Sequence, residues 1–139
     1  MSRKFSEPSA KIFAAHQVSF AYLFGSRALG KAHPGSDRDI AVRFRPNTSK
    51  SRRFDLRLKL WNRLSDIWPR EALDLIDLGE APLLLQFRAI QPGKLLFSQN
   101  ELERVRFEAS TMSQYFDRQY YIDRGAKQSI AQVARQGLR

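Results

Sequence analysis

The chain alternates between short apolar runs and longer segments in which apolar residues recur at helical spacing. Residues 18–24 (VSFAYLF) and 37–44 (DRDIAVRF) are rich in β-branched and aromatic residues, which is typical of buried strands. Residues 72–78 (ALDLIDL) predict a third strand. Residues 91–97 (QPGKLLF) predict a turn and a short fourth strand, because Pro and Gly precede the apolar run.

Helices are predicted before, between and after these strands. The predicted segments are residues 8–16, 26–32 (a short helix or a turn), 52–68, 81–90 and 101–124. The last segment carries one apolar stripe, which is most often a core face or a helix-packing seam. Its members are Leu102, Val105, Ala109, Met112, Phe116 and Tyr120. We therefore expect a domain over residues 1–124 and a basic, flexible tail over residues 125–139.

The segment 52–68 fits two periods. One set of its apolar residues alternates as in a strand, namely Phe54, Leu56, Leu58 and Leu60. A second set recurs as in a helix, namely Leu60, Trp61, Leu64, Ile67 and Trp68. The length of the segment and Pro69 directly after it favour the helix.

The order of these elements predicts an α/β fold of the α+β kind. The connection between the first two strands is too short for an ordinary crossover helix, so these strands are not expected to be parallel neighbours. A small mixed β-sheet with helices packed on it is therefore favoured over a doubly wound parallel sheet. The 139 residues suffice for one such domain.

Charge and composition narrow the class of protein. The formal net charge is +10, which favours an anionic partner such as a nucleotide, a nucleic acid or an acidic protein. Much of the excess falls within residues 43–63, which contain eight basic residues and a single acidic one, Asp55. This basic region is either a functional surface or a solvated face. Its basic residues are Arg43, Arg45, Lys50, Arg52, Arg53, Arg57, Lys59 and Arg63.

The absence of cysteine excludes a disulfide framework, a thiolate zinc site and a cysteine nucleophile. The apolar runs are far shorter than the ~20 residues that a membrane helix requires. The N-terminal segment is interrupted by Glu7 and Pro8 and does not resemble a signal peptide. We expect a cytoplasmic protein with no membrane partner.

Candidate chemistry lies between the first two strands. Asp37 and Asp39 are two residues apart in a predicted strand, so their carboxylates face the same way about 6.7 Å apart along the strand. They would repel each other by about 2.5 kcal/mol at an effective dielectric constant of 20. A cation between them would offset this, and Mg²⁺ prefers such oxygen ligands. Gly25 and Ser26 end the preceding strand, where a glycine lets backbone N–H groups approach a phosphate.

Gly25-Ser26, ten residues, and then Asp37-Arg38-Asp39 resembles the signature of the DNA polymerase β-type nucleotidyltransferase superfamily. The resemblance implies a third catalytic carboxylate on a neighbouring strand, for which residues 72–78 offer Asp74 and Asp77. These two are three apart and face opposite sides of a strand. Asp74 fits the family pattern better, because the family's acid lies early in such a strand.

The whole arrangement resembles the minimal nucleotidyltransferases of the MntA antitoxin type, over roughly residues 10–124. The resemblance implies an antitoxin of a type VII-like toxin–antitoxin pair that transfers AMP from ATP to a tyrosine of a HEPN-domain RNase toxin, releasing pyrophosphate. It also implies two Mg²⁺ ions, and it carries roles over to two sets of residues. The catalytic and metal-binding residues would be Asp37, Asp39 and Asp74, and the nucleotide-binding residues Gly25, Ser26 and Arg27.

Two other functions stay open at this stage. The chain could modify a small molecule, as aminoglycoside nucleotidyltransferases do. It could also be a non-catalytic module that uses the basic region on RNA or on an acidic partner, and nucleic acid is the less favoured of these partners. Tyr115, Tyr120 and Tyr121 are candidates for interface anchors or for plain packing.

Overall fold

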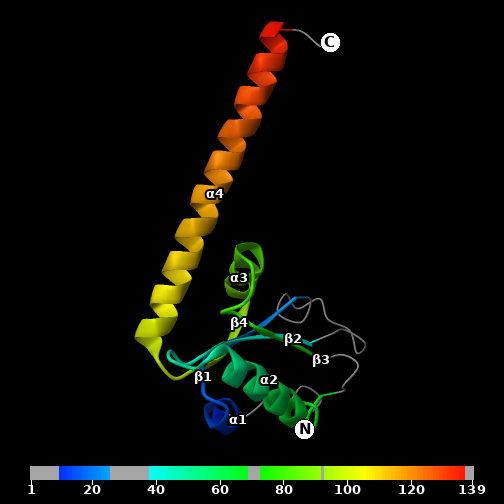
Figure 1. Cartoon of the computed structure of the whole chain (residues 1–139), viewed down its shortest axis with the longest axis vertical. Coiled ribbons are helices and arrows are strands. Elements are labelled where there is room, and N and C mark those ends of the chain that lie inside the picture. The colour runs from blue at the N-terminus through cyan, green and yellow to red at the C-terminus, as the bar shows by residue number, and fades with distance from the viewer. Residues whose placement is uncertain (1–9, 26–37, 69–72, 92, 137–139) are drawn as a thin grey trace.

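The computed structural model describes residues 10–25, 38–68, 73–91 and 93–136 (Figure 1). Four strands form one sheet in the order β3-β2-β1-β4. Strand β1 is antiparallel to both of its neighbours, β2 and β4, whereas β2 and β3 are parallel. The predicted mixed sheet is confirmed. The strands are β1 (Val18–Phe24), β2 (Arg38–Phe44), β3 (Leu73–Asp77) and β4 (Lys94–Ser98).

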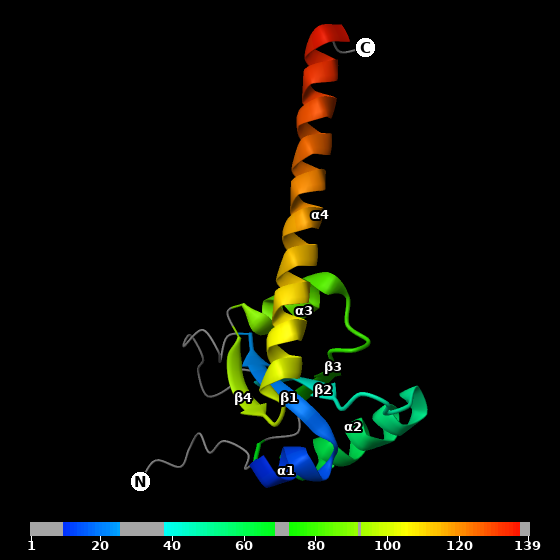
Figure 2. The same ribbon diagram turned by 90° about the vertical axis from the view of Figure 1, so that its left-hand side faces the viewer.

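The helices pack on both faces of the sheet. Helices α1 and α2 cover one face, and α3 and the first half of α4 cover the other (Figures 1 and 2). Their bounds are α1 (Ala10–Ala15), α2 (Lys50–Leu64), α3 (Leu83–Ile90) and α4 (Glu101–Gln136). The predicted short helix or turn at 26–32 lies outside the described residues. No helix within the described ranges is both long enough and apolar enough to cross a bilayer.

Helix α2 resolves the ambiguous segment. Leu56, Leu60 and Leu64 are buried against the sheet at helical spacing, whereas Phe54 and Leu58 are about half exposed. The apparent alternation combined buried and exposed positions of one helix. The helix begins after Ser49, whose hydroxyl accepts the N–H of Arg52, and it ends at Leu64, four residues before the predicted end at 68.

A polar network fastens the start of α4 to the other face of the sheet. The Tyr22 hydroxyl, on β1, donates to Glu108 Oε2 at 2.5 Å. Arg104 donates to Glu108 at 2.8 Å and also pairs with Glu101. The apolar residues around this network include Phe20, Ala41, Ala89 and Phe107. Side chains from one helix and one central strand therefore fix the direction in which α4 leaves the domain.

One prediction about α4 is wrong, and one of the two expectations for its apolar stripe is excluded. The helix does not end at Arg124 but continues through Gly125 to Gln136, so the segment 125–136 is helical rather than a loose tail. Glycine disfavours a helix by only about 1 kcal/mol, and the neighbouring Ala, Arg, Lys and Gln residues favour it. The apolar stripe is also not a core face, because most of its side chains are exposed. All residues from 116 to 134 are exposed, and this part of α4 projects beyond the domain (Figures 1 and 2).

Candidate active site

Gly25 lies directly after β1 and against the carboxylate of Asp39. Its φ angle of +79° falls in the region that favours glycine. A Cβ atom added to Gly25 would lie 2.5 Å from Asp39 Oδ2, which is too close for any real contact. The position therefore requires glycine twice, once for its backbone angle and once for the carboxylate beside it.

Asp39 and Asp74 are brought side by side by the parallel pairing of β2 and β3. They are direct partners in the register of these strands, so their side chains leave the sheet on the same face from backbones about 4.8 Å apart. Asp39 is partly buried and Asp74 is exposed. Their neighbours on this face are Ala41 and Ile76, which face α3 and α4. Asp39 and Asp74 thus lie on the same face of two adjacent strands, as a shared site would require.

Asp77 lies on the opposite face of β3 and has a structural environment. Its side chain is 7% exposed, and Oδ2 accepts a hydrogen bond from Arg53 Nε at 3.0 Å. Its Oδ1 accepts the backbone N–H of Gly79 at 2.8 Å. Arg53 is further held by Glu80 at 2.6 Å, and these hydrogen bonds, the one to Glu80 first, raise the pKa of Arg53 above its usual value. Asp77 therefore fastens α2 to β3.

Arg38 separates the two aspartates of the sequence motif and has a packing role that sequence reasoning missed. Its side chain is buried, and its guanidinium lies 5.1 Å from the ring centroid of Trp68. In a strand it points away from the face that carries Asp39. Strict alternation of side chains along the motif was the signal that could have indicated this.

Three of the predicted site residues, Ser26, Arg27 and Asp37, lie outside the described residues. Within the described ranges, no group of three His, Cys, Asp or Glu residues is arranged to hold a metal ion. The described part of the site is thus Gly25 with the pair Asp39 and Asp74.

The chemistry of this pair fits a divalent cation. Two carboxylates about 5 Å apart would repel each other by about 3 kcal/mol at an effective dielectric constant of 20. Their oxygens are the ligand type that Mg²⁺ prefers. Gly25 leaves the space beside Asp39 Oδ2 free of a side chain, as access by a phosphate or a metal ion requires. Asp39 and Asp74 would share this cation from two adjacent strands.

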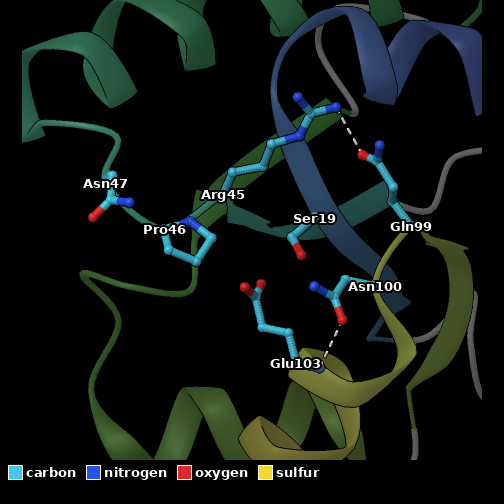
Figure 3. Close-up of a pocket in the computed structure, with 7 residues that line it drawn as sticks. All are labelled: Ser19, Arg45, Pro46, Asn47, Gln99, Asn100 and Glu103. Carbon is cyan, nitrogen blue, oxygen red and sulfur yellow. Dashed lines mark hydrogen bonds between the residues drawn. The ribbon is translucent and has the colours of Figure 1, made fainter.

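A cavity of about 500 Å³ lies at the other end of β1 (Figure 3). Its lining residues are Ser19, Arg45, Pro46, Asn47, Gln99, Asn100 and Glu103. Arg45 donates to Gln99 Oε1 at 2.7 Å, and Asn100 Oδ1 accepts the N–H of Glu103 and caps α4. Because Ser19 is five residues from Phe24 along the strand, about 17 Å separates this cavity from the aspartates. It is not part of the candidate active site.

A mixed sheet with a glycine at the end of its first strand and paired carboxylates on the next two fits metal-assisted transfer at phosphorus. Residues 8–102 match the family model described as polymerase beta, nucleotidyltransferase. The chain therefore belongs to this family and is a nucleotidyltransferase.

Individual relatives agree with the family assignment. The chain is 33% identical over 100 residues to protein adenylyltransferase MntA of Shewanella oneidensis, a match that covers 71% of this chain and 67% of the relative. A solved toxin–antitoxin structure with AMP-PNP has 30% identity and a TM-score of 0.58, covering 84% of this chain and 94% of that one. A solved complex of the tri-AMPylated Shewanella oneidensis HEPN toxin with its MNT antitoxin has 28% identity and a TM-score of 0.54, covering 84% and 91%.

Proposed function

We propose that this nucleotidyltransferase is an Mg²⁺-dependent protein adenylyltransferase. It transfers AMP from ATP to a tyrosine hydroxyl of a HEPN-domain RNase toxin and so acts as the antitoxin of a type VII-like pair. The observation that carries the proposal is the register of β2 and β3, which sets Asp39 beside Asp74 on one face, next to Gly25. Such a pair serves metal-assisted transfer at phosphorus.

The relatives support ATP as the donor of the AMP group and a protein as its acceptor. The curated relative is a protein adenylyltransferase, which indicates that the acceptor is a protein and the group is AMP. One solved relative is a complex with the ATP analogue AMP-PNP, and another contains an AMPylated HEPN toxin. We carry these properties over because the chain shares the fold and 28–33% of the aligned residues with those proteins.

The candidate site residues would bind the metal ions, bind the phosphates and assist proton removal. Asp37, Asp39 and Asp74 would hold two Mg²⁺ ions, which when bound neutralise the charge of the triphosphate and of the transition state. Gly25, Ser26 and Arg27 would contact the outer phosphates. The acceptor oxygen forms a bond to the α-phosphorus while the bond from that phosphorus to the β-phosphate oxygen breaks. Pyrophosphate leaves, and Asp74 would help to remove the proton of the hydroxyl.

Intact-mass spectrometry tests this function. The chain is incubated with its candidate partner, a HEPN-domain protein, together with ATP and Mg²⁺, and the partner should gain one or more AMP units. Asp39→Ala should abolish the gain, because Asp39 is the member of the pair that lies against Gly25. A partner that stays unmodified with the wild-type enzyme, or a variant that transfers as fast as wild type, would contradict the proposal.

A further inference from the structure

A second cavity, of about 200 Å³, lies where β2 and β3 end, and we call it the arginine pocket. Three of its lining residues are arginines from different segments: Arg43 from β2, Arg45 from the loop that follows and Arg53 from α2. It adjoins the larger cavity of Figure 3, with which it shares Arg45. Arg43 is four residues from Asp39 along β2, or about 13 Å, so the pocket is at the opposite end of the strand from the candidate active site.

Two of the three arginines are held by uncharged groups. The guanidinium of Arg43 lies 5.4 Å from the ring centroid of Phe107, and Arg45 donates to the side-chain oxygen of Gln99 at 2.7 Å. Neither arginine forms an ion pair with a carboxylate of the described residues. Their side chains are therefore positioned by contacts that leave both positive charges unbalanced.

The acidic residue of the pocket is already engaged. Asp77 Oδ2 accepts a hydrogen bond from Arg53 Nε, and Oδ1 accepts the backbone N–H of Gly79. With Arg53 balancing Asp77, the charged residues that line the pocket leave a charge of +2. A phosphate group carries about −1.5 to −2 at neutral pH and would balance it. Guanidinium groups also match the geometry of phosphate oxygens.

The size and the surroundings of the pocket favour a small ligand. Its volume is below the roughly 300–1,000 Å³ of pockets that take drug-sized molecules, so it suits a single phosphate group. The cavities next to it carry carboxylates, from Glu103 on α4 and from Glu80 after β3. A nucleic-acid backbone binds along a continuous basic surface, which these carboxylates interrupt.

Gly79 leaves room inside the pocket. A Cβ atom added there would lie 3.2 Å from Arg43 Nη1 and 3.2 Å from Asp77 Oδ1, which is tighter than ordinary contact. Glycine therefore keeps open a point beside the Arg43 guanidinium. The φ angle of Gly79 lies outside the left-handed region, so its backbone can accept alanine.

We propose that the arginine pocket binds one phosphate group of a small molecule, either inorganic phosphate or a phosphate monoester, through Arg43 and Arg45. The site is separate from the candidate active site and shares no residue with it. The inference is therefore independent of the proposed function. Because the bound group would join β2, the loop after it and α2, phosphate should stabilise the folded chain.

Calorimetry of the full chain with inorganic phosphate tests the site. EDTA is present, so that no divalent cation brings phosphate to the aspartates. Arg43→Gln with Arg45→Gln should weaken phosphate binding about tenfold or more. The matched control, Arg106→Gln with Arg118→Gln, removes the same charge from exposed positions on α4 and should change the affinity by less than about twofold. Phosphate should raise the melting temperature of the wild type and the control, but not of the pocket variant.

Gly79→Ala tests the geometry at constant charge and serves if the double arginine variant does not fold. The added methyl group crowds Arg43, so phosphate should bind severalfold more weakly although the net charge is unchanged. Competition with AMP, a phosphate monoester, distinguishes the two sources of the ligand. Displacement of phosphate by AMP assigns the pocket to a phosphorylated metabolite, and failure to displace it assigns the pocket to inorganic phosphate.

Three results would overturn the proposal. The first is the absence of phosphate binding to the wild-type chain at millimolar concentrations. The second is an equal loss of binding in the pocket variant and the α4 control, because the attraction is then a property of the net charge alone. The third is binding of an RNA oligonucleotide that requires Arg43 and Arg45 when inorganic phosphate does not bind, because the ligand is then a nucleic-acid backbone.

Discussion

Asp74 and Asp77 have the same side chain and differ only in the face of β3 that they occupy. Asp74 shares its face with Asp39, and it is exposed. Asp74→Asn keeps the shape but removes the charge, so we expect transfer to fall at least a hundredfold while ATP binding and the free energy of unfolding stay close to wild type. Single-turnover transfer assays and urea unfolding measure the two effects. An active Asp74→Asn enzyme would show that the third carboxylate lies elsewhere.

Asp77→Asn should give the reverse result. Asp77 is buried and receives a charge-assisted hydrogen bond from Arg53, so we expect about 2 kcal/mol of destabilisation. Transfer should persist at temperatures where the variant is folded, because the side chain faces α2. Urea unfolding gives the stability, and an activity assay well below the melting temperature gives the transfer rate. Loss of transfer in a fully folded Asp77→Asn enzyme would mean that Asp77, and not Asp74, faces the active site.

The sequence could predict candidate site residues where their arrangement depends only on spacing along the chain. The two-residue repeat of a strand put Asp74 and Asp77 on opposite faces, and the family resemblance favoured Asp74. The Gly-Ser and Asp-x-Asp spacing pointed to Gly25 and Asp39. The partner of Asp77 was not predictable, because Arg53 lies 24 residues away along the chain and meets it only when α2 packs on the sheet. Pairings of this kind depend on the tertiary fold rather than on a local period.

At the scale of elements, an apolar stripe predicts a helix but does not say what covers it. The sequence indicated the stripe on α4 correctly, yet the face that packs on the domain contains Arg104, Glu108 and Thr111. Those polar residues are satisfied by one another and by Tyr22, so their polarity is no barrier to burial. The pattern therefore predicted the helix; of the two expectations for its stripe, the core face is excluded and the helix-packing seam stays a prediction.

Tyr22→Phe tests this attachment of α4. It removes one hydrogen bond to a part-buried carboxylate, so we expect about 1 kcal/mol of destabilisation at neutral pH. Burial, and then the hydrogen bond to Glu108, raises the pKa of Tyr22 above its usual value. A raised pKa stabilises the fold fully below the unfolded pKa of about 10 and progressively less above it. The stability gap between wild type and Tyr22→Phe should thus narrow above pH 10.

Urea unfolding as a function of pH measures that gap. Tyr121→Phe is the matched control, because the side chain of Tyr121 is 71% exposed and should shift neither value. A gap that widens at alkaline pH would show that the Tyr22 hydroxyl is not a neutral donor in the folded protein. Equal stability of wild type and Tyr22→Phe at pH 7 would show that Arg104 alone holds Glu108.

At the scale of the whole molecule, the basic region 43–63 is not one surface. Arg53 is engaged by Asp77 and Glu80, Arg43 lies over the ring of Phe107, and Arg45 bonds Gln99. The cations on the outside of α2 include Arg52 and Arg57. A charge run in the sequence mixes internal and external cations because it carries no information about which side chains turn inward. The sequence could thus predict an anionic partner but not where that partner binds.

Replacing Arg52 and Arg57 by Glu tests whether the charges of α2 only attract the partner at long range or also contact it in the complex. Because α2 lies on the opposite face of the sheet from Asp39 and Asp74, these charges should guide an acidic partner without touching it at the candidate active site. We expect association to slow severalfold at low salt and to match wild type near 0.5 M salt, where the screening length falls to about 4 Å. Dissociation should not change, and stopped-flow mixing with the HEPN-domain protein measures both rates.

Arg53 is excluded from the reversal because its loss would leave Asp77 buried without its partner. Faster dissociation would place α2 inside the interface, whereas unchanged rates at low salt would make its charges a solvated face.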